Sequence, residues 1–242
     1  MATVLLVRHG RTDANVRGVL AGRTPGVRLD EVGRGQAARA GDRLAAVPLV
    51  RVVTSPLERC RETADLLLAR MSEAPDLTVD DALTECDYGT WQGRSLADLA
   101  GEPLWTTVQS HPAAVTFPGG ESLAAVQARA VAAVRRYDAA VEDQHGPGAL
   151  WAAVSHGDVI KAVLADALGM HLDLFQRLDV GPASVSLVRY GPSRPQVIAV
   201  NTDGGDLGWL GTARPVDDAP VGGGAGHGSA AAARPVGALD RS

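Results

Sequence analysis

Three short apolar runs, each ending in a polar turn that leads into a helix, constrain the fold of this chain more than any other feature. The runs are Thr3–Val7, Val50–Thr54 and Ala149–Val154, and all are rich in β-branched or small apolar side chains. Such runs are typical of strands buried on both faces. Strands alternating with helices predict an α/β fold, a three-layer α/β/α sandwich with a mostly parallel central sheet. Ligands bind such sheets beyond the carboxyl ends of the strands.

Helical periodicity follows the first two runs. We expect a helix from Asp30 to about Ala46. A second helix is expected directly after the second run, where Ser55 would cap the free N–H groups and Pro56 suits the first helical position. Glu58 would then complete a capping box. These residues therefore predict a helix that starts at the end of a strand.

The second half of the chain continues the alternation. Apolar residues at steps of three and four predict a long helix over Leu123–Val141, and a further helix is expected after Asp158. Two outer strands are expected at Ser184–Arg189 and Gln196–Val200, although the prolines between them make their pairing uncertain. We expect one domain over residues 1–205.

Composition limits the compartment and the partners. A formal net charge of −5 gives no electrostatic reason to expect nucleic acid or an acidic membrane as a partner. Cys60 and Cys86 have neither metal-binding nor disulfide spacing, and no stretch suits a signal peptide or a bilayer span, so we expect a cytoplasmic protein. Residues 211–242 contain 18 Gly, Ala or Pro among 32 residues, which predicts a flexible tail. The sequence leaves the oligomeric state open, with a homodimer as one option.

The polar turns after the three runs carry cations and imidazoles. Arg8 and His9 follow the first run, Arg59 lies in the first turn of the helix expected after the second, and His156 follows the third. Arginine holds oxyanions with its planar fork, and neutral imidazole is a nucleophile near neutral pH. One histidine in such a turn is more often structural than catalytic. Two such turns and an arginine at a third predict instead that these side chains converge on one anion-binding crevice.

Further candidates lie in two other segments. Thr12 and Asn15 could hydrogen-bond a ligand or fix the tautomer of the imidazole. The loop Leu83–Gly93 holds a carboxyl group among apolar and aromatic neighbours, which would raise its pKa. Glu85 is thus suited to protonate a leaving alkoxide, with Asp87 as the competing candidate.

These motifs resemble those of the histidine phosphatase superfamily, also called the phosphoglycerate mutase-like family. The resemblance runs from Thr3 to about Val200 and implies the phosphoglycerate mutase-like fold. It is carried by five motifs: Arg8-His9-Gly10, Ser55-Pro56-Leu57-Glu58-Arg59, the loop from Glu85 to Gly93, Pro118-Gly119-Gly120-Glu121-Ser122, and Ser155-His156-Gly157.

The resemblance also implies a reaction and a set of site residues. A phosphohistidine intermediate would form on His9, with Glu85 as general acid and base, during hydrolysis of a small phosphate monoester without a metal or cofactor. The implied phosphate-binding and substrate-contacting positions are Arg8, Asn15, Ala21, Gly22, Arg59, His156 and the backbone N–H of Gly157. One departure concerns the loop Gly22–Asp30, where relatives usually carry an acidic residue and a Pro-Leu-Thr or Pro-Leu-Ser, so substrate contacts from this loop are in question.

Other functions are weighed against a phosphatase. A phosphomutase must hold two phosphate groups, yet residues 94–117 contain one arginine, one histidine and no lysine, and they offer apolar surface at Leu104, Trp105, Val115 and Phe117. A metallohydrolase is disfavoured by the arginines beside the site. A non-catalytic phosphate-binding module would be expected to lack a key site residue, and none is missing. The glycine-containing run at residues 33–38 fits a dinucleotide fingerprint loosely, but it lies within a helical pattern, so we discount it.

Overall fold

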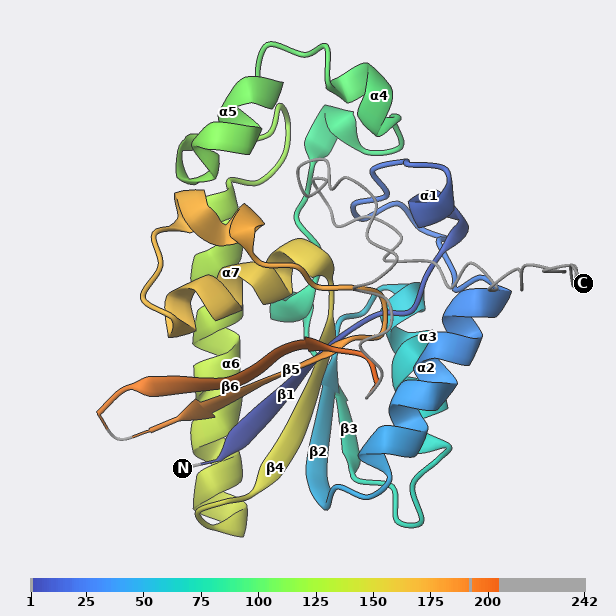
Figure 1. Cartoon of the computed structure of the whole chain (residues 1–242), viewed down its shortest axis with the longest axis vertical. Coiled ribbons are helices and arrows are strands. Elements are labelled where there is room, and N and C mark those ends of the chain that lie inside the picture. The colour runs from blue at the N-terminus through green and yellow to red at the C-terminus, as the bar shows by residue number, and fades with distance from the viewer. Residues whose placement is uncertain (1, 192, 205–242) are drawn as a thin grey trace, which may run out of the picture.

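Six strands form one twisted sheet at the centre of the molecule (Figure 1). The computed structural model describes residues 2–191 and 193–204, and the segment predicted to be a tail, residues 211–242, lies outside the described residues. The strand order is β3-β2-β4-β1-β5-β6. The strands are β1 (Thr3–Arg8), β2 (Leu49–Thr54), β3 (Asp76–Val79), β4 (Leu150–Ser155), β5 (Val185–Tyr190) and β6 (Pro195–Thr202).

The sheet is mixed, and its parallel part contains the three strands whose ends carry the polar turns. β4 pairs in parallel with β1 on one side and with β2 on the other, and β2 pairs in parallel with β3. The two outer strands β5 and β6 run antiparallel, at the positions predicted from the sequence. The carboxyl ends of β1, β2 and β4 therefore meet at one edge of the sheet.

Helices cover both faces, which confirms the predicted three-layer sandwich (Figure 1). Alternate residues of each buried strand point to opposite faces: Leu5 and Val7 pack with one cluster, and Val4 and Leu6 pack with the other. Helices α2 (Glu31–Leu44) and α3 (Glu58–Leu68) supply the first cluster, while α6 (Leu123–His145) and α7 (Gly157–Ala167) supply the second. No helix in the described ranges is both long and apolar enough to cross a membrane.

Short helices and loops rise above the carboxyl ends of the strands (Figure 1). They are the helices α1 (Asp13–Val16), α4 (Leu96–Leu99) and α5 (Trp105–Ser110) and the 3-10 turns at Asp81–Leu83, Gly89–Trp91, Pro112–Ala114 and Leu172–Arg177. Thr12 and Asn15 form a capping box at the start of α1. This layer supplies the loops that surround the strand ends.

The predicted start of α3 is wrong by two residues. Ser55 does not cap this helix: α3 begins at Glu58, with Leu57 at the N-cap and no side-chain cap. The Ser55 hydroxyl contacts His156 instead, and the Glu58 carboxylate accepts a hydrogen bond from the backbone N–H of Gly26. The side chains of Ser55 and Glu58, which a local capping box would use, therefore contact residues far away in the sequence.

Two glycines in α2 give a matched test of this packing. A Cβ atom at Gly33 would collide with the backbone carbonyl of Arg11, whereas one at Gly35 would meet only the flexible end of Arg39, at 3.5 Å. We expect Gly33→Ala to lower the free energy of unfolding by about 2 kcal/mol because backbone has to move. Gly35→Ala should raise it by up to about 1 kcal/mol through helix propensity. Urea denaturation checks both, and equal effects would contradict the close approach of α2 to the loop after His9.

Candidate active site

Five charged or titratable side chains predicted from the sequence converge at the carboxyl edge of the sheet. They are Arg8, His9, Arg59, Glu85 and His156, and none is more than 4% exposed. Arg8 at the end of β1 pairs in register with Ser155 at the end of β4, and His9 and His156 directly follow these two paired residues. The two imidazole centroids lie 5.3 Å apart at 61°. The geometry therefore brings together residues that are far apart in the chain.

The imidazole of His9 is held as one neutral tautomer. Its Nδ1 lies 2.7 Å from the backbone carbonyl of Gly10, and because a carbonyl only accepts, Nδ1 carries the proton. The lone pair is thus on Nε2, to which Arg59 Nε donates at 3.3 Å. Burial and the positive charges of Arg59 and Arg8 lower the pKa of His9 well below its usual value. The tautomer is therefore fixed by Gly10, and not by Thr12 or Asn15, as one sequence-based alternative held.

Two nitrogens of the Arg59 guanidinium donate hydrogen bonds, and the third has no partner among the described residues. Its Nη2 donates to the carbonyl of Gly22 at 2.8 Å and its Nε donates to His9. Nη1 is buried and has no hydrogen-bond partner among the described residues. A buried guanidinium nitrogen left in this way has the geometry and charge to bind an oxyanion.

Arg8 and His156 are also buried at this edge of the sheet. Arg8 Nη1 donates to the carbonyl of Val180 at 2.7 Å, and burial lowers the pKa of this guanidinium. His156 Nε2 lies 2.8 Å from Ser55 Oγ and 3.4 Å from Cys60 Sγ. Burial and the charge of Arg59 lower the pKa of His156 well below its usual value, so this ring is also neutral.

Glu85 is the carboxyl group of the site. Burial first, and then the nearby charge of Asp158, raise its pKa to about 7, against the opposing charge of Arg59. Its Oε1 accepts a hydrogen bond from the N–H of Cys86 at 2.9 Å. The competing candidate Asp87 is engaged elsewhere, because its Oδ1 accepts from the N–H of Gly89 at 2.9 Å.

One pocket connects most of the predicted residues. Its lining consists of His9, Thr12, Ala14, Asn15, Gly18, Val19, Leu20, Ala21, Gly22, Arg59, Glu85, Tyr88 and Leu96. Thr12 donates both its N–H and its hydroxyl to Asn15 Oδ1, so the two residues hold each other at the wall of the pocket. The predicted residues Arg8, His156 and Gly157 do not line the pocket, and Gly157 is the buried first residue of α7.

Sequence reasoning missed several contributors and misplaced others. Ser55 and Cys60 contact His156, and the Tyr88 hydroxyl donates to Asp158 Oδ2 at 2.7 Å. Ser55 and Tyr88 lie within motifs identified in the sequence and Cys60 directly follows one, but nothing in these motifs indicated the contacts. Val115 and Phe117, expected to offer apolar surface to a substrate, are buried in the core instead, and Leu104 and Trp105 pack against that core.

The remaining histidines and the cysteines lie outside the pocket lining. His111, His145 and His171 are exposed, and His227 lies outside the described residues. Cys60 and Cys86 are buried free thiols. Within residues 2–191 and 193–204, no group of three or more His, Cys, Asp or Glu side chains is arranged to hold a metal ion.

Comparisons with known proteins show which sequences this chain is similar to. Over 206 residues the chain is 35% identical to a protein of Mycobacterium tuberculosis described as bifunctional, covering 83% of this chain and 54% of that protein. The chain thus spans about half the length of this relative. It is also 32% identical over 170 residues to a 2,3-bisphosphoglycerate-dependent phosphoglycerate mutase 2 of Gloeobacter violaceus, covering 69% of this chain and 75% of that protein.

A solved structure shows the same fold. A mycobacterial glucosyl-3-phosphoglycerate phosphatase, solved with VO3, superposes with a TM-score of 0.74 at 28% identity, covering 83% of this chain and 99% of that one. The model of the family described as histidine phosphatase superfamily (branch 1) matches residues 4–203. Because this match covers most of its length, the chain belongs to the histidine phosphatase superfamily, branch 1.

Proposed function

We propose that this chain is a metal-independent phosphatase that hydrolyses a small phosphate monoester through a phosphohistidine intermediate on His9. The observation that carries the proposal is the position of His9 Nε2, an unprotonated nitrogen 3.3 Å from the buried guanidinium of Arg59. Arg59 also has a buried nitrogen without a partner among the described residues. A phosphoryl group seated on this guanidinium would face the lone pair of His9.

In the first step, His9 Nε2 forms an N–P bond while the bond from phosphorus to the ester oxygen breaks. The proton of the Glu85 carboxyl goes to the leaving alkoxide, which departs as the alcohol. A carboxyl group whose pKa is about 7 is protonated often enough near neutral pH to act as this acid. Arg59, Arg8 and His156 would stabilise the charge that spreads over the phosphoryl oxygens.

In the second step, water attacks the phosphorus atom. Glu85, now a carboxylate, takes a proton from the water as the new P–O bond forms, and the N–P bond breaks to release inorganic phosphate and neutral His9. The same carboxyl group therefore serves as acid and then as base, and it returns to its starting state. No other reactant is required.

The pocket lining favours hydrolysis over phosphate transfer between two phosphorylated compounds. Arg59 is the one arginine or lysine among the lining residues of the described pocket, and Val19, Leu20 and Leu96 supply apolar surface. A second phosphate group would need further cations. We therefore propose a monophosphate ester whose alcohol portion is less charged than a second phosphate group. Because one relative is described as a phosphoglycerate mutase of Gloeobacter violaceus, phosphomutase activity is the second candidate function.

The covalent step is tested by trapping. Brief incubation with a ³²P-labelled alkyl phosphate followed by quenching should leave label on the protein that is stable in base and lost in acid, as expected for a phosphohistidine. Turnover should persist in EDTA. Label that never appears on protein during turnover would contradict the covalent route, and loss of turnover on chelation would favour a metallohydrolase.

The same preparation separates the two candidate functions. A phosphatase releases inorganic phosphate from a panel of sugar, glycerate, nucleotide and lipid-precursor phosphates. A mutase would instead pass the label from the phosphoenzyme to added 3-phosphoglycerate faster than to water. Binding of phosphate without any turnover or labelling would leave a non-catalytic phosphate-binding module.

A further inference from the structure

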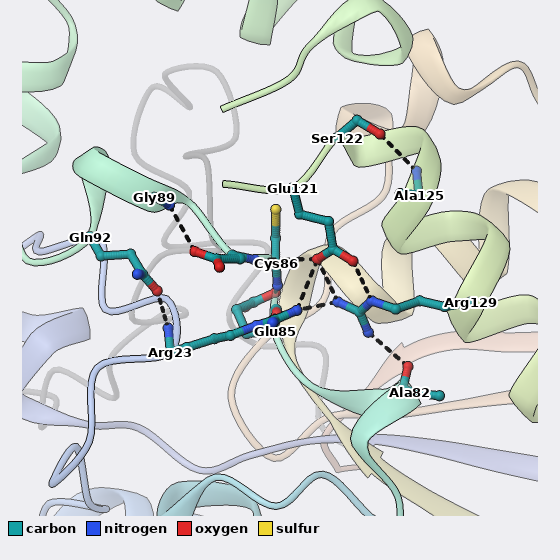
Figure 2. A network of polar contacts seen from close by, with 11 residues as sticks. Arg23, Ala82, Glu85, Cys86, Gly89, Gln92, Glu121, Ser122, Ala125 and Arg129 are labelled. Atoms are coloured by element: carbon teal, nitrogen blue, oxygen red, sulfur yellow. Dashed lines mark hydrogen bonds and ion pairs between the residues drawn. The ribbon is translucent and has the colours of Figure 1, made fainter. Parts of the chain in front are cut away.

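Three charged side chains lie around the backbone of the loop that carries Glu85 (Figure 2). We call Arg23, Glu121 and Arg129 the Glu121 cluster. Arg23 comes from the loop after Gly22, Glu121 directly precedes the N-cap of α6, and Arg129 comes from the second turn of that helix. Sequence reasoning assigned none of the three a role. Their common neighbour is the backbone around Glu85.

Glu121 is the centre of the cluster. Its Oε1 accepts from Arg129 Nε at 2.7 Å, and its Oε2 accepts from Nη2 of both arginines at 3.0 Å. The Arg129 contact is bidentate, and the Arg129 and Glu121 side chains are only 20% and 19% exposed. Bidentate, partly buried pairs of this kind hold a fixed geometry better than exposed ion pairs do.

The cluster holds the main chain before, at and after Glu85. The Glu85 carbonyl accepts from Arg23 Nε at 2.8 Å and from Arg129 Nη2 at 3.2 Å. Arg129 Nη1 donates to the carbonyl of Ala82 at 2.8 Å, and the N–H of Asp87 donates to Glu121 Oε2 at 3.3 Å. The backbone that aims the Glu85 side chain is thus fixed on both sides.

Arg23 extends this network to the phosphate-binding side of the pocket. It directly follows Gly22, whose carbonyl accepts from Arg59 Nη2 at 2.8 Å. Its own N–H donates to Gln92 Oε1, and Figure 2 shows Arg23 reaching from Gln92 to Glu121. One arginine therefore connects the pocket wall that holds Arg59 with the loop that holds Glu85.

We propose that Glu121 is a positioning residue that, through Arg23 and Arg129, sets the distance between the carboxyl group of Glu85 and the phosphoryl group on Arg59. The proposal rests on the proposed role of Glu85 as general acid and base. A shift of about 1 Å in a reacting group can reduce a rate by as much as 100-fold. Loosening the cluster should therefore impair proton transfer while leaving phosphate binding and attack by His9 in place.

Substrates with different leaving groups separate this role from a merely structural one. An alkoxide leaving from glycerol 2-phosphate needs a proton from Glu85, whereas p-nitrophenolate leaves without one. We expect Glu121→Gln to lower kcat/KM on glycerol 2-phosphate by about 10- to 100-fold and kcat/KM on p-nitrophenyl phosphate by less than about 3-fold, because kcat/KM covers only the steps up to departure of the leaving group. Arg23→Ala should show the same contrast on a smaller scale, since Arg129 remains.

Arg94→Ala is the matched control. Arg94 is 39% exposed, close to the 35% of Arg23, and its guanidinium pairs with Glu102 at 2.6 Å. This variant should show no contrast between the two substrates. Glu85→Gln is measured alongside and should show the largest contrast.

The outcomes distinguish the inference from the function on which it rests. If Glu85→Gln shows the contrast and Glu121→Gln does not, the positioning role is wrong and the proposed function stands. If Glu121→Gln slows both substrates equally, the cluster is only structural and the inference is also wrong. If Glu85→Gln itself shows no contrast, the acid assignment fails and the inference falls with it.

Discussion

Replacing His9 with alanine is expected to reduce turnover by on the order of 10³-fold or more and to abolish labelling of the protein by substrate. The reason is chemical, because the variant keeps both arginines but has no nitrogen to form the N–P bond. Arg59 Nη1 should still bind an oxyanion in this variant. Steady-state kinetics with an alkyl phosphate, together with the rise in melting temperature on adding inorganic phosphate, measures the two effects separately.

His111→Ala is the control for this prediction. His111 is exposed and caps the end of α5, outside the pocket lining. Its substitution should leave turnover and labelling unchanged. Retention of more than about a tenth of the wild-type rate in His9→Ala would contradict the assignment of the nucleophile.

Glu85→Gln is expected to remove the alkaline decline of the pH profile. In the wild-type protein, the pKa of Glu85 is raised to about 7, so the protonated acid is lost as pH rises through this value. Wild-type kcat/KM for an alkyl phosphate should therefore fall about tenfold per pH unit well above pH 7. The variant should be slower by roughly 10²- to 10³-fold at pH 6 and nearly independent of pH from 6 to 8.

The same substitution should stabilise the fold. Because the folded-state pKa of Glu85 is raised from 4.5 to about 7, its protonated form favours folding fully below about pH 4.5, and this contribution is lost as pH rises through about 7. Glu85→Gln should then raise the free energy of unfolding by up to about 3 kcal/mol at pH 8 and have little effect at pH 4. Glu31→Gln, at an exposed position, is the control for the stability measurement. For the pH profile, a decline in kcat/KM that persists in Glu85→Gln would show that another group causes the decline.

The parts of the site that follow strands could be predicted from the sequence. Buried strands have a distinct composition, and parallel strands bring their carboxyl ends to one edge, so the convergence of His9 and His156 required no knowledge of side-chain contacts. The strand order itself was not predicted, because β1 pairs with β4 across most of the chain. Adjacency of this kind depends on packing between segments that are remote in sequence.

Polar contacts between loops could not be predicted. Ser55 has the local pattern of a helix cap, and only the fold shows that its hydroxyl contacts His156. Glu121 lies in a recognisable motif, yet the two arginines that bind it come from a different loop and from a helix. Local sequence gives the chemical capacity of such side chains, whereas the tertiary structure decides which partner they take.

The buried nitrogen of Arg59 has a consequence for the end of the catalytic cycle. The protein itself offers Nη1 no acceptor among the described residues, so any tetrahedral oxyanion that enters supplies one. In the proposed reaction, inorganic phosphate, the last product, would meet this need as well as the substrate does. The group that captures the ester would thus also delay product departure, and affinity for phosphate would set an upper limit on how fast the site can be cleared.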